Sequence, residues 1–107
     1  MLNGSFQMSS SKQNPYLVQK IMTASPEQLI GYIYDAGIAA CGREDKAKAL
    51  QAVQELINAL NFDYKDVAAT FYSIYRYILD QIREKNFQGA KESLTEIKSA
   101  WAKAHQL

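Results

Sequence analysis

The stretch of sequence that decides the fold is residues 25–41, SPEQLIGYIYDAGIAAC. Ser25 is a good helix-capping residue, Pro26 has the backbone angle preferred at the first helical position, and Gln28 completes an S-x-x-Q capping box. No proline follows in the rest of the chain. We therefore expect a first helix that begins here and ends near Gly42, with further helices after it.

Three more helices are predicted downstream. Apolar residues recur every three or four positions, as on the buried face of a helix, from about Arg43 to Leu60 and from about Lys65 to Lys85. The last stripe runs from Ala90 to Ala104, and residues 86–89 read as an interruption before it. Short connections favour antiparallel neighbours. The predicted fold is all-α, an antiparallel up-down four-helix bundle preceded by a short N-terminal helical or extended segment.

The length of the chain is that of one domain. It has 107 residues, and a second hydrophobic core would have too little chain to form it. Residues 1–13 are polar and lack the apolar stretch of a secretory signal. We therefore expect a disordered leader over residues 1–13 and a single bundle domain over residues 14–107.

Composition and charge argue against several classes of function. Lys and Arg number 12 against 11 Asp and Glu, a balance that disfavours nucleic-acid binding through a basic face. No apolar run approaches the ~18–20 residues needed to cross a bilayer, so we expect no membrane insertion. Cys41 is the only cysteine, which excludes an intrachain disulfide and is typical of a reduced, cytoplasmic protein.

The residue inventory does not favour an enzyme. His105 is the only histidine and lies near the chain end, where we expect it to be solvated, so a catalytic triad, a zinc site or a ferritin-like carboxylate site lacks its side chains. Cys41 is predicted to be a small buried residue, and Asp35 a solvated residue at a helix edge. We therefore predict no catalytic, cofactor-binding or metal-binding residue.

The first and third predicted helices carry more apolar surface than a small bundle needs. At ~100° per residue, the large apolar residues of 29–41 spread over roughly 180° and those of 67–82 over roughly 160°, whereas one core-facing stripe covers ~100–120°. One interpretation is that these two helices lie centrally, with tyrosine hydroxyls directed to water. A second is a groove for an amphipathic partner segment, and a third is a homodimer interface.

Several short motifs carry a resemblance to a known family. Asn14-Pro15-Tyr16 precedes residues 22–29, MTASPEQL, and Tyr34-Asp35 follows them. Further on, Val67-Ala68, Ile74-Tyr75-Arg76-Tyr77 and the stretch from Ile97 to Trp101 agree with the family in order and spacing. In these motifs the chain resembles FliS, the flagellin-specific export chaperone of bacteria.

The resemblance implies a function as well as a fold. It implies a cytoplasmic four-helix bundle that binds the C-terminal segment of newly made flagellin. Covering that segment would prevent premature filament polymerisation and keep the subunit competent for flagellar type III export. Other flagellar regulatory or export proteins are further candidate partners. A segment that is disordered when free and orders on binding can cover a large surface at moderate affinity.

The wide apolar arcs and the resemblance together select candidate binding residues. The N-terminal segment of the family can lie over the apolar groove when cargo is absent, and by position Tyr16 and Met22 would belong to that cover. The alternative is a short helix that plugs the bundle end. Cargo contacts are expected from Ile30, Tyr34, Tyr72, Tyr75 and Leu79. Core positions are expected at Phe71, Ile78, Leu94 and Trp101.

Overall fold

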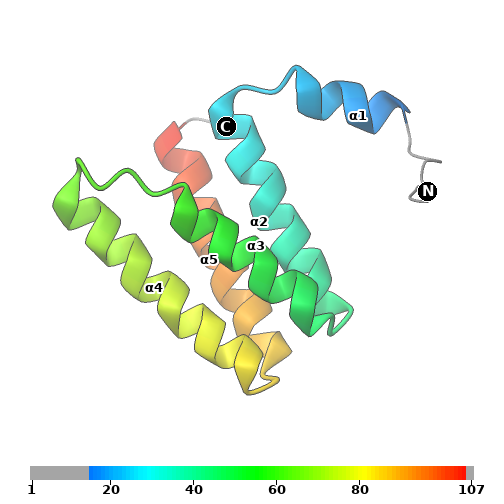
Figure 1. Cartoon of the computed structure of the whole chain (residues 1–107). Helices are drawn as coiled ribbons and strands as arrows, with labels where there is room; N and C mark the ends of the chain where they lie inside the picture. The colour runs from blue at the N-terminus through cyan, green and yellow to red at the C-terminus, as the bar shows by residue number, and fades with distance from the viewer. Residues whose placement is uncertain (1–14, 106–107) are drawn as a thin grey trace, which may run out of the picture.

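A computed structural model describes residues 15–105 of the chain, and all the regular secondary structure of this part is helical (Figure 1). The prediction of an all-α fold is confirmed for these residues, whereas the predicted leader, residues 1–13, lies outside them. The helices are α1 (Pro15–Met22), α2 (Pro26–Gly42), α3 (Lys46–Asn58), α4 (Lys65–Arg83) and α5 (Phe87–His105).

Helices α2 to α5 form the bundle. Figure 1 shows that they run alternately in opposite directions, as expected for helices joined by short turns. Each packs against the next in chain order, and α5 packs against α2, which closes the ring. Helix α1 projects from the N-terminal end of α2 and lies outside the ring.

The capping box predicted at the start of α2 is confirmed. The backbone N–H of Gln28 donates to Ser25 Oγ at 3.1 Å, and the backbone N–H of Ser25 donates to Gln28 Oε1 at 2.9 Å. Pro26 occupies the first turn. Two of the N–H groups that a helix leaves without internal partners are therefore satisfied by side chains, which fixes the first residue of α2.

The turn between α2 and α3 lies within a stretch for which the apolar pattern predicted helix. Glu44 has a φ of 58°, in the left-handed region, and a helix does not continue through such a residue. Asp45 then accepts a hydrogen bond from the Lys48 backbone N–H and caps α3. The predicted start at Arg43 is therefore wrong by three residues.

The turn between α4 and α5 is built in the same way. Lys85 has a φ of 62°, so α4 ends at Arg83 and not at the predicted Lys85. Asn86 Oδ1 accepts a hydrogen bond at 3.1 Å from the Gly89 backbone N–H, which makes Asn86 the cap of α5. The predicted interruption exists but lies at residues 84–86, because residues 87–89 form the first turn of α5.

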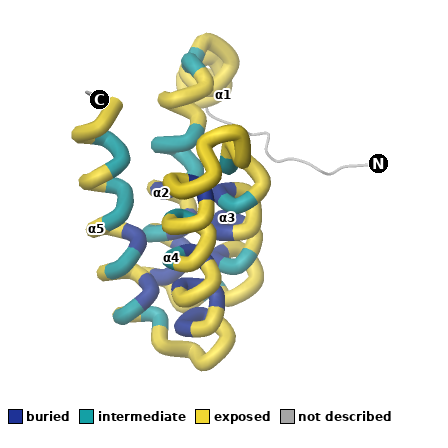
Figure 2. The backbone as a smooth tube through the Cα atoms, turned by 90° about the vertical axis from the view of Figure 1, so that its left-hand side faces the viewer, coloured by how far each residue is buried: buried dark blue, intermediate teal, exposed yellow. Residues whose placement is uncertain are grey.

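Burial is uneven along the bundle. The buried residues of α2 begin at Tyr34, those of α5 end at Leu94, and α4 buries Ala68 alone before Tyr75. Figure 2 shows the buried backbone mainly in the half of the bundle away from α1. We call the half that contains the α2–α3 and α4–α5 turns the closed half and the other half the open half. Ile78 and Leu94 are fully buried as predicted, but Phe71 and Trp101 are only partly buried.

Gly37 allows the helices of the closed half to approach closely. A Cβ atom at this position would lie 3.3 Å from Ala52 Cβ and 3.3 Å from Leu94 Cδ1. Gly37 is buried, so α2 contacts both α3 and α5 through its backbone at this point. Only glycine fits this approach without displacing a neighbour.

We predict that Gly37→Val lowers the free energy of unfolding by about 1–3 kcal/mol, because the added isopropyl group overpacks this contact. Gly42→Val is the matched control, since a Cβ there meets only the Lys91 ammonium, at 3.8 Å. The control should change stability by less than about 0.5 kcal/mol. Urea unfolding measures both variants, and equal values for the two would contradict the close-approach account.

Candidate functional site

An apolar cleft of about 380 Å³ lies in the open half. All four bundle helices and the α3–α4 loop contribute to it, and we call it the end cleft. Its size is in the range of sites that hold several apolar side chains. The residues that line it are Ile30, Leu56, Ala59, Leu60, Asn61, Tyr64, Val67, Ala68, Phe71, Tyr75, Trp101 and His105.

The α3–α4 loop places apolar side chains at the mouth of the end cleft. Asn61 Oδ1 accepts a hydrogen bond from the Asp63 backbone N–H at 3.0 Å, and the Asn61 carbonyl accepts one from the Tyr64 N–H at 3.2 Å. This turn ends directly before α4. Tyr64 is 68% exposed and Val67 58% exposed, so two large apolar side chains stand at the mouth in contact with water.

The floor of the end cleft is aromatic. Tyr75 lines it, and the hydroxyl groups of Tyr75 and Tyr34 form a hydrogen bond with each other at 2.5 Å. The Trp101 ring lies 5.6 Å from the Tyr34 ring, centroid to centroid. Burial raises the pKa of Tyr34 and of Tyr75, so both phenols are neutral at physiological pH. The floor therefore offers a rigid, uncharged aromatic surface.

His105 is exposed, as the sequence predicted for a residue near the chain end, and its side chain also contacts Trp101. Its Nδ1 lies 2.9 Å from the Trp101 carbonyl oxygen, and the two rings have centroids 5.0 Å apart. The last turn of α5 thus places both side chains on the lining of the end cleft. The sequence did not predict the contact of His105 with Trp101, because residues near a chain end often fray.

Two predicted cargo residues line the end cleft, and two others are in the core. Ile30 and Tyr75 are part of its lining. Tyr34 is fully buried, Leu79 is 4% exposed, and neither lines the end cleft, so the structure does not place these two expected cargo residues at a surface open to cargo. A helical wheel gives the width of an apolar arc but not which edge faces the neighbouring helices. In α2 and α4 these residues lie on the inner side.

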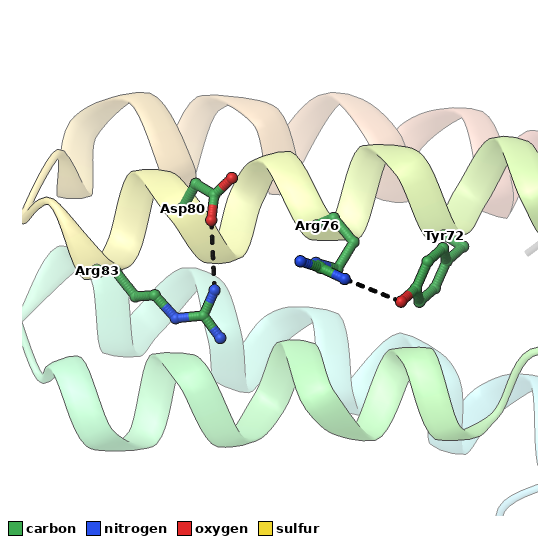
Figure 3. Close-up of polar contacts among 4 residues, drawn as sticks. All are labelled: Tyr72, Arg76, Asp80 and Arg83. Atoms are coloured by element: carbon green, nitrogen blue, oxygen red, sulfur yellow. Dashed lines mark hydrogen bonds and ion pairs between the residues drawn. The ribbon is translucent and has the colours of Figure 1, made fainter.

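The remaining predicted residues lie outside the end cleft. Tyr72 is 37% exposed on α4, where its hydroxyl accepts a hydrogen bond at 3.0 Å from Arg76 Nη1 (Figure 3). Tyr16 and Met22 are on α1 and are 76% and 79% exposed. The Lys20 ammonium lies 5.3 Å from the centroid of the Tyr32 ring, which joins α1 to α2.

The predicted cargo contacts did not include the exposed residues at the mouth of the end cleft. Tyr64 belongs to a turn, where periodicity carries little information, whereas Val67 was placed on the apolar arc of its helix but not among the cargo contacts. The available signal was the presence of two aromatic residues, Phe62 and Tyr64, in the connection between α3 and α4. Phe71 and Trp101 were assigned to the core, and they both pack on the core and line the end cleft.

Other reactive or ionisable side chains lie away from the end cleft. Burial raises the pKa of the Cys41 thiol. Asp35 pairs with Lys98 at 2.6 Å, an ion pair that links α2 to α5. Within residues 15–105, no three His, Cys, Asp or Glu side chains come together as a metal site would require. No described helix has the length and apolar character needed to cross a membrane.

Comparison with known proteins identifies the family. A family model described as flagellar protein FliS matches residues 42–106, which is more than half of the chain. The chain belongs to the FliS family. FliS proteins are flagellar chaperones and not a family of enzymes, so the partners of this chain are flagellar proteins. No curated protein and no solved structure matches the chain. The FliS match includes α3, α4 and α5, which supply most of the lining of the end cleft.

The buried tyrosine pair predicts a dependence of stability on alkaline pH. The folded chain holds the Tyr34 and Tyr75 protons more tightly than the unfolded chain, whose tyrosines have pKa values of about 10. The free energy of unfolding should therefore fall as pH rises above about 10, because only the unfolded chain releases these protons there.

Urea unfolding of the Tyr34→Phe/Tyr75→Phe double variant between about pH 8 and 11 checks this prediction. Its free energy of unfolding should fall less steeply above pH 10 than that of the wild type. Tyr77→Phe is the control, because Tyr77 is 60% exposed. Parallel curves for the double variant and the wild type would contradict the assignment.

Proposed function

We propose that this chain is a cytoplasmic chaperone that holds the C-terminal segment of flagellin in the end cleft, prevents its premature polymerisation and keeps it competent for type III export. The observation that carries the proposal is the open half of the bundle, with an apolar cleft of about 380 Å³. Membership of the FliS family supports a flagellar partner. The flagellin segment and the export route come from the family resemblance of the sequence.

Exposed apolar side chains provide the driving force for such binding. Tyr64 and Val67 stand mostly in water at the mouth, and burying a side chain of this kind contributes about 1.5–3 kcal/mol. Ile30 and Tyr75 extend the apolar lining toward the bundle interior. Part of this free energy is spent on ordering the bound segment, which keeps the affinity moderate and allows release.

We assign Tyr16 and Met22 to a movable cover. Both are on α1, the helix that projects from the open half, and both are mostly exposed in the present arrangement. A rotation about the short connection between α1 and α2, residues 23–25, would bring α1 toward the end cleft. In that position α1 competes with cargo for the same apolar lining.

Binding to flagellin itself tests the proposed function. The chain should co-purify with flagellin of the same bacterium and fail to do so when flagellin lacks its C-terminal ~40 residues, a length that can wrap a small domain. Equal recovery with both forms would contradict it. Failure with both, together with a mass that doubles with concentration, would instead favour a homodimer formed through the same exposed apolar surface.

Variants at the mouth locate the binding site. Tyr64→Ala and Val67→Ser should each lower the affinity for a synthetic flagellin C-terminal peptide by about 10-fold, as expected when an interface loses a large apolar contact. Tyr77→Ala is the control, because Tyr77 is similarly exposed but does not line the end cleft. Calorimetric titration gives the three affinities. Loss of affinity in the control alone would move the site away from the end cleft.

The cover requires its own variant. The Tyr16→Ser/Met22→Ser double variant should bind the same peptide about 2–5-fold more tightly, because a weaker cover leaves a larger fraction of the chain competent for binding. Calorimetric titration against the wild type measures the ratio. An unchanged affinity would favour the alternative, in which α1 only plugs the bundle end.

A further inference from the structure

Arg76 differs from the other two arginines of the chain because it forms no ion pair with a carboxylate in residues 15–105. Arg83 pairs with Asp80 at 3.3 Å, and Arg43 pairs with Asp45 at 4.0 Å. Across residues 15–105, no carboxylate lies within ion-pair distance of Arg76. An exposed guanidinium without a fixed counter-ion is available to an acidic group from outside.

The guanidinium of Arg76 is nevertheless held in place. Its Nη1 donates to the Tyr72 hydroxyl at 3.0 Å, and its Cζ lies 5.8 Å from the centroid of the Tyr72 ring. Figure 3 shows Arg76 directed along α4 toward Tyr72, while Asp80, one turn away on the other side, is directed toward Arg83. Asp80 is paired with Arg83 and lies beyond ion-pair distance of Arg76.

The chemistry of this pair suits a carboxylate. A guanidinium has five N–H donors in a planar fork, and the bond to Tyr72 uses one of them. The Tyr72 hydroxyl accepts that bond, so its own proton remains to be donated, and the described part of the chain supplies no acceptor for it. Arg76 and Tyr72 can therefore donate together to one carboxylate, which is the strongest type of side-chain hydrogen bonding.

The position of the pair connects it to the end cleft. Ala68 and Phe71 line the end cleft, and Tyr72 lies one helical turn after Ala68 on the same helix. Arg76 follows one turn later, which places it roughly 12 Å along α4 from Ala68 at 1.5 Å per residue. A segment that leaves the end cleft along α4 would reach Arg76 after about 4 extended residues or about 8 helical residues.

We propose that Arg76 and Tyr72 bind the side-chain carboxylate of an aspartate or glutamate in the partner segment that occupies the end cleft. This inference rests on the proposed function and adds to it an anchor of defined chemistry. The apolar cleft supplies most of the affinity, and the carboxylate contact sets the register of the bound segment. The partner is therefore a segment whose apolar part fills the end cleft and whose acidic residue lies before or after that part in the sequence.

Calorimetric titration of the full chain with a synthetic peptide of the flagellin C-terminal segment tests the inference. Arg76→Gln should lower the affinity by about 5–10-fold, a value between those of exposed and desolvated charge pairs. Arg76→Lys keeps the charge but not the fork, so it should recover only part of this loss. Tyr72→Phe should cost about 2–5-fold, because one donor is removed.

The control variant is Arg43→Gln. It removes the same charge from a similarly exposed arginine in the closed half, so it should change the affinity by less than about 2-fold. Arg83→Gln is a poorer control, because it would release Asp80 to pair with Arg76. Thermal unfolding verifies that each variant folds, which we expect because all of these side chains are exposed.

A second peptide, with every Asp and Glu replaced by Asn and Gln, completes a double-mutant cycle. Its affinity for the wild type should be about as low as that of the native peptide for Arg76→Gln. Its affinities for the wild type and for Arg76→Gln should be equal. Unchanged affinity of Arg76→Gln for the native peptide would overturn the inference and leave the proposed function intact. Absence of binding between the native peptide and the wild type would overturn both. A flagellin C-terminal segment without an acidic residue would also contradict the inference.

Discussion

The hydrogen bond between the Tyr34 and Tyr75 hydroxyls lies at the boundary between the two halves of the bundle. It connects the first buried residue of α2 to the point in α4 after which buried residues become frequent. On one side, Gly37 brings α2 against α3 and α5. On the other side, the Trp101 ring packs on Tyr34 and lines the end cleft. The pair therefore ends the packed core and provides the floor of the binding surface.

This division explains how a small bundle can be stable and still expose apolar surface. The closed half supplies the close-packed contacts that a domain of this size needs to fold. The open half is left with an apolar cleft whose mouth includes Tyr64 and Val67, and exposed apolar surface of this kind marks an interaction site. Since folding does not depend on filling the end cleft, a partner segment can enter and leave it.

The sequence predicted the elements of the fold better than the directions of their side chains. The capping box at Ser25 and the apolar periodicity predicted the helices, because both signals are local. The end of α2 at Gly42 was predicted, but the start of α3 and the end of α4 were displaced by two or three residues, since nothing local announces left-handed residues that are not glycine, such as Glu44 and Lys85. Tyr34 and Leu79 were expected to face cargo but do not line the end cleft, because the orientation of a wide apolar arc is set by neighbouring helices that are distant in sequence. The position of the end cleft in the bundle was therefore not predicted, although the motifs did indicate the family and with it a flagellar partner.

Hydrogen exchange of the full chain, with and without the flagellin C-terminal segment, tests most directly whether the end cleft is the binding surface. The account predicts slower exchange on binding at residues 59–71 and in the last turn of α5, because these segments line the end cleft. Amides of the α2–α3 turn, residues 42–46, should exchange at the same rate in both samples. Protection confined to that turn, with residues 59–71 unaffected, would contradict the account.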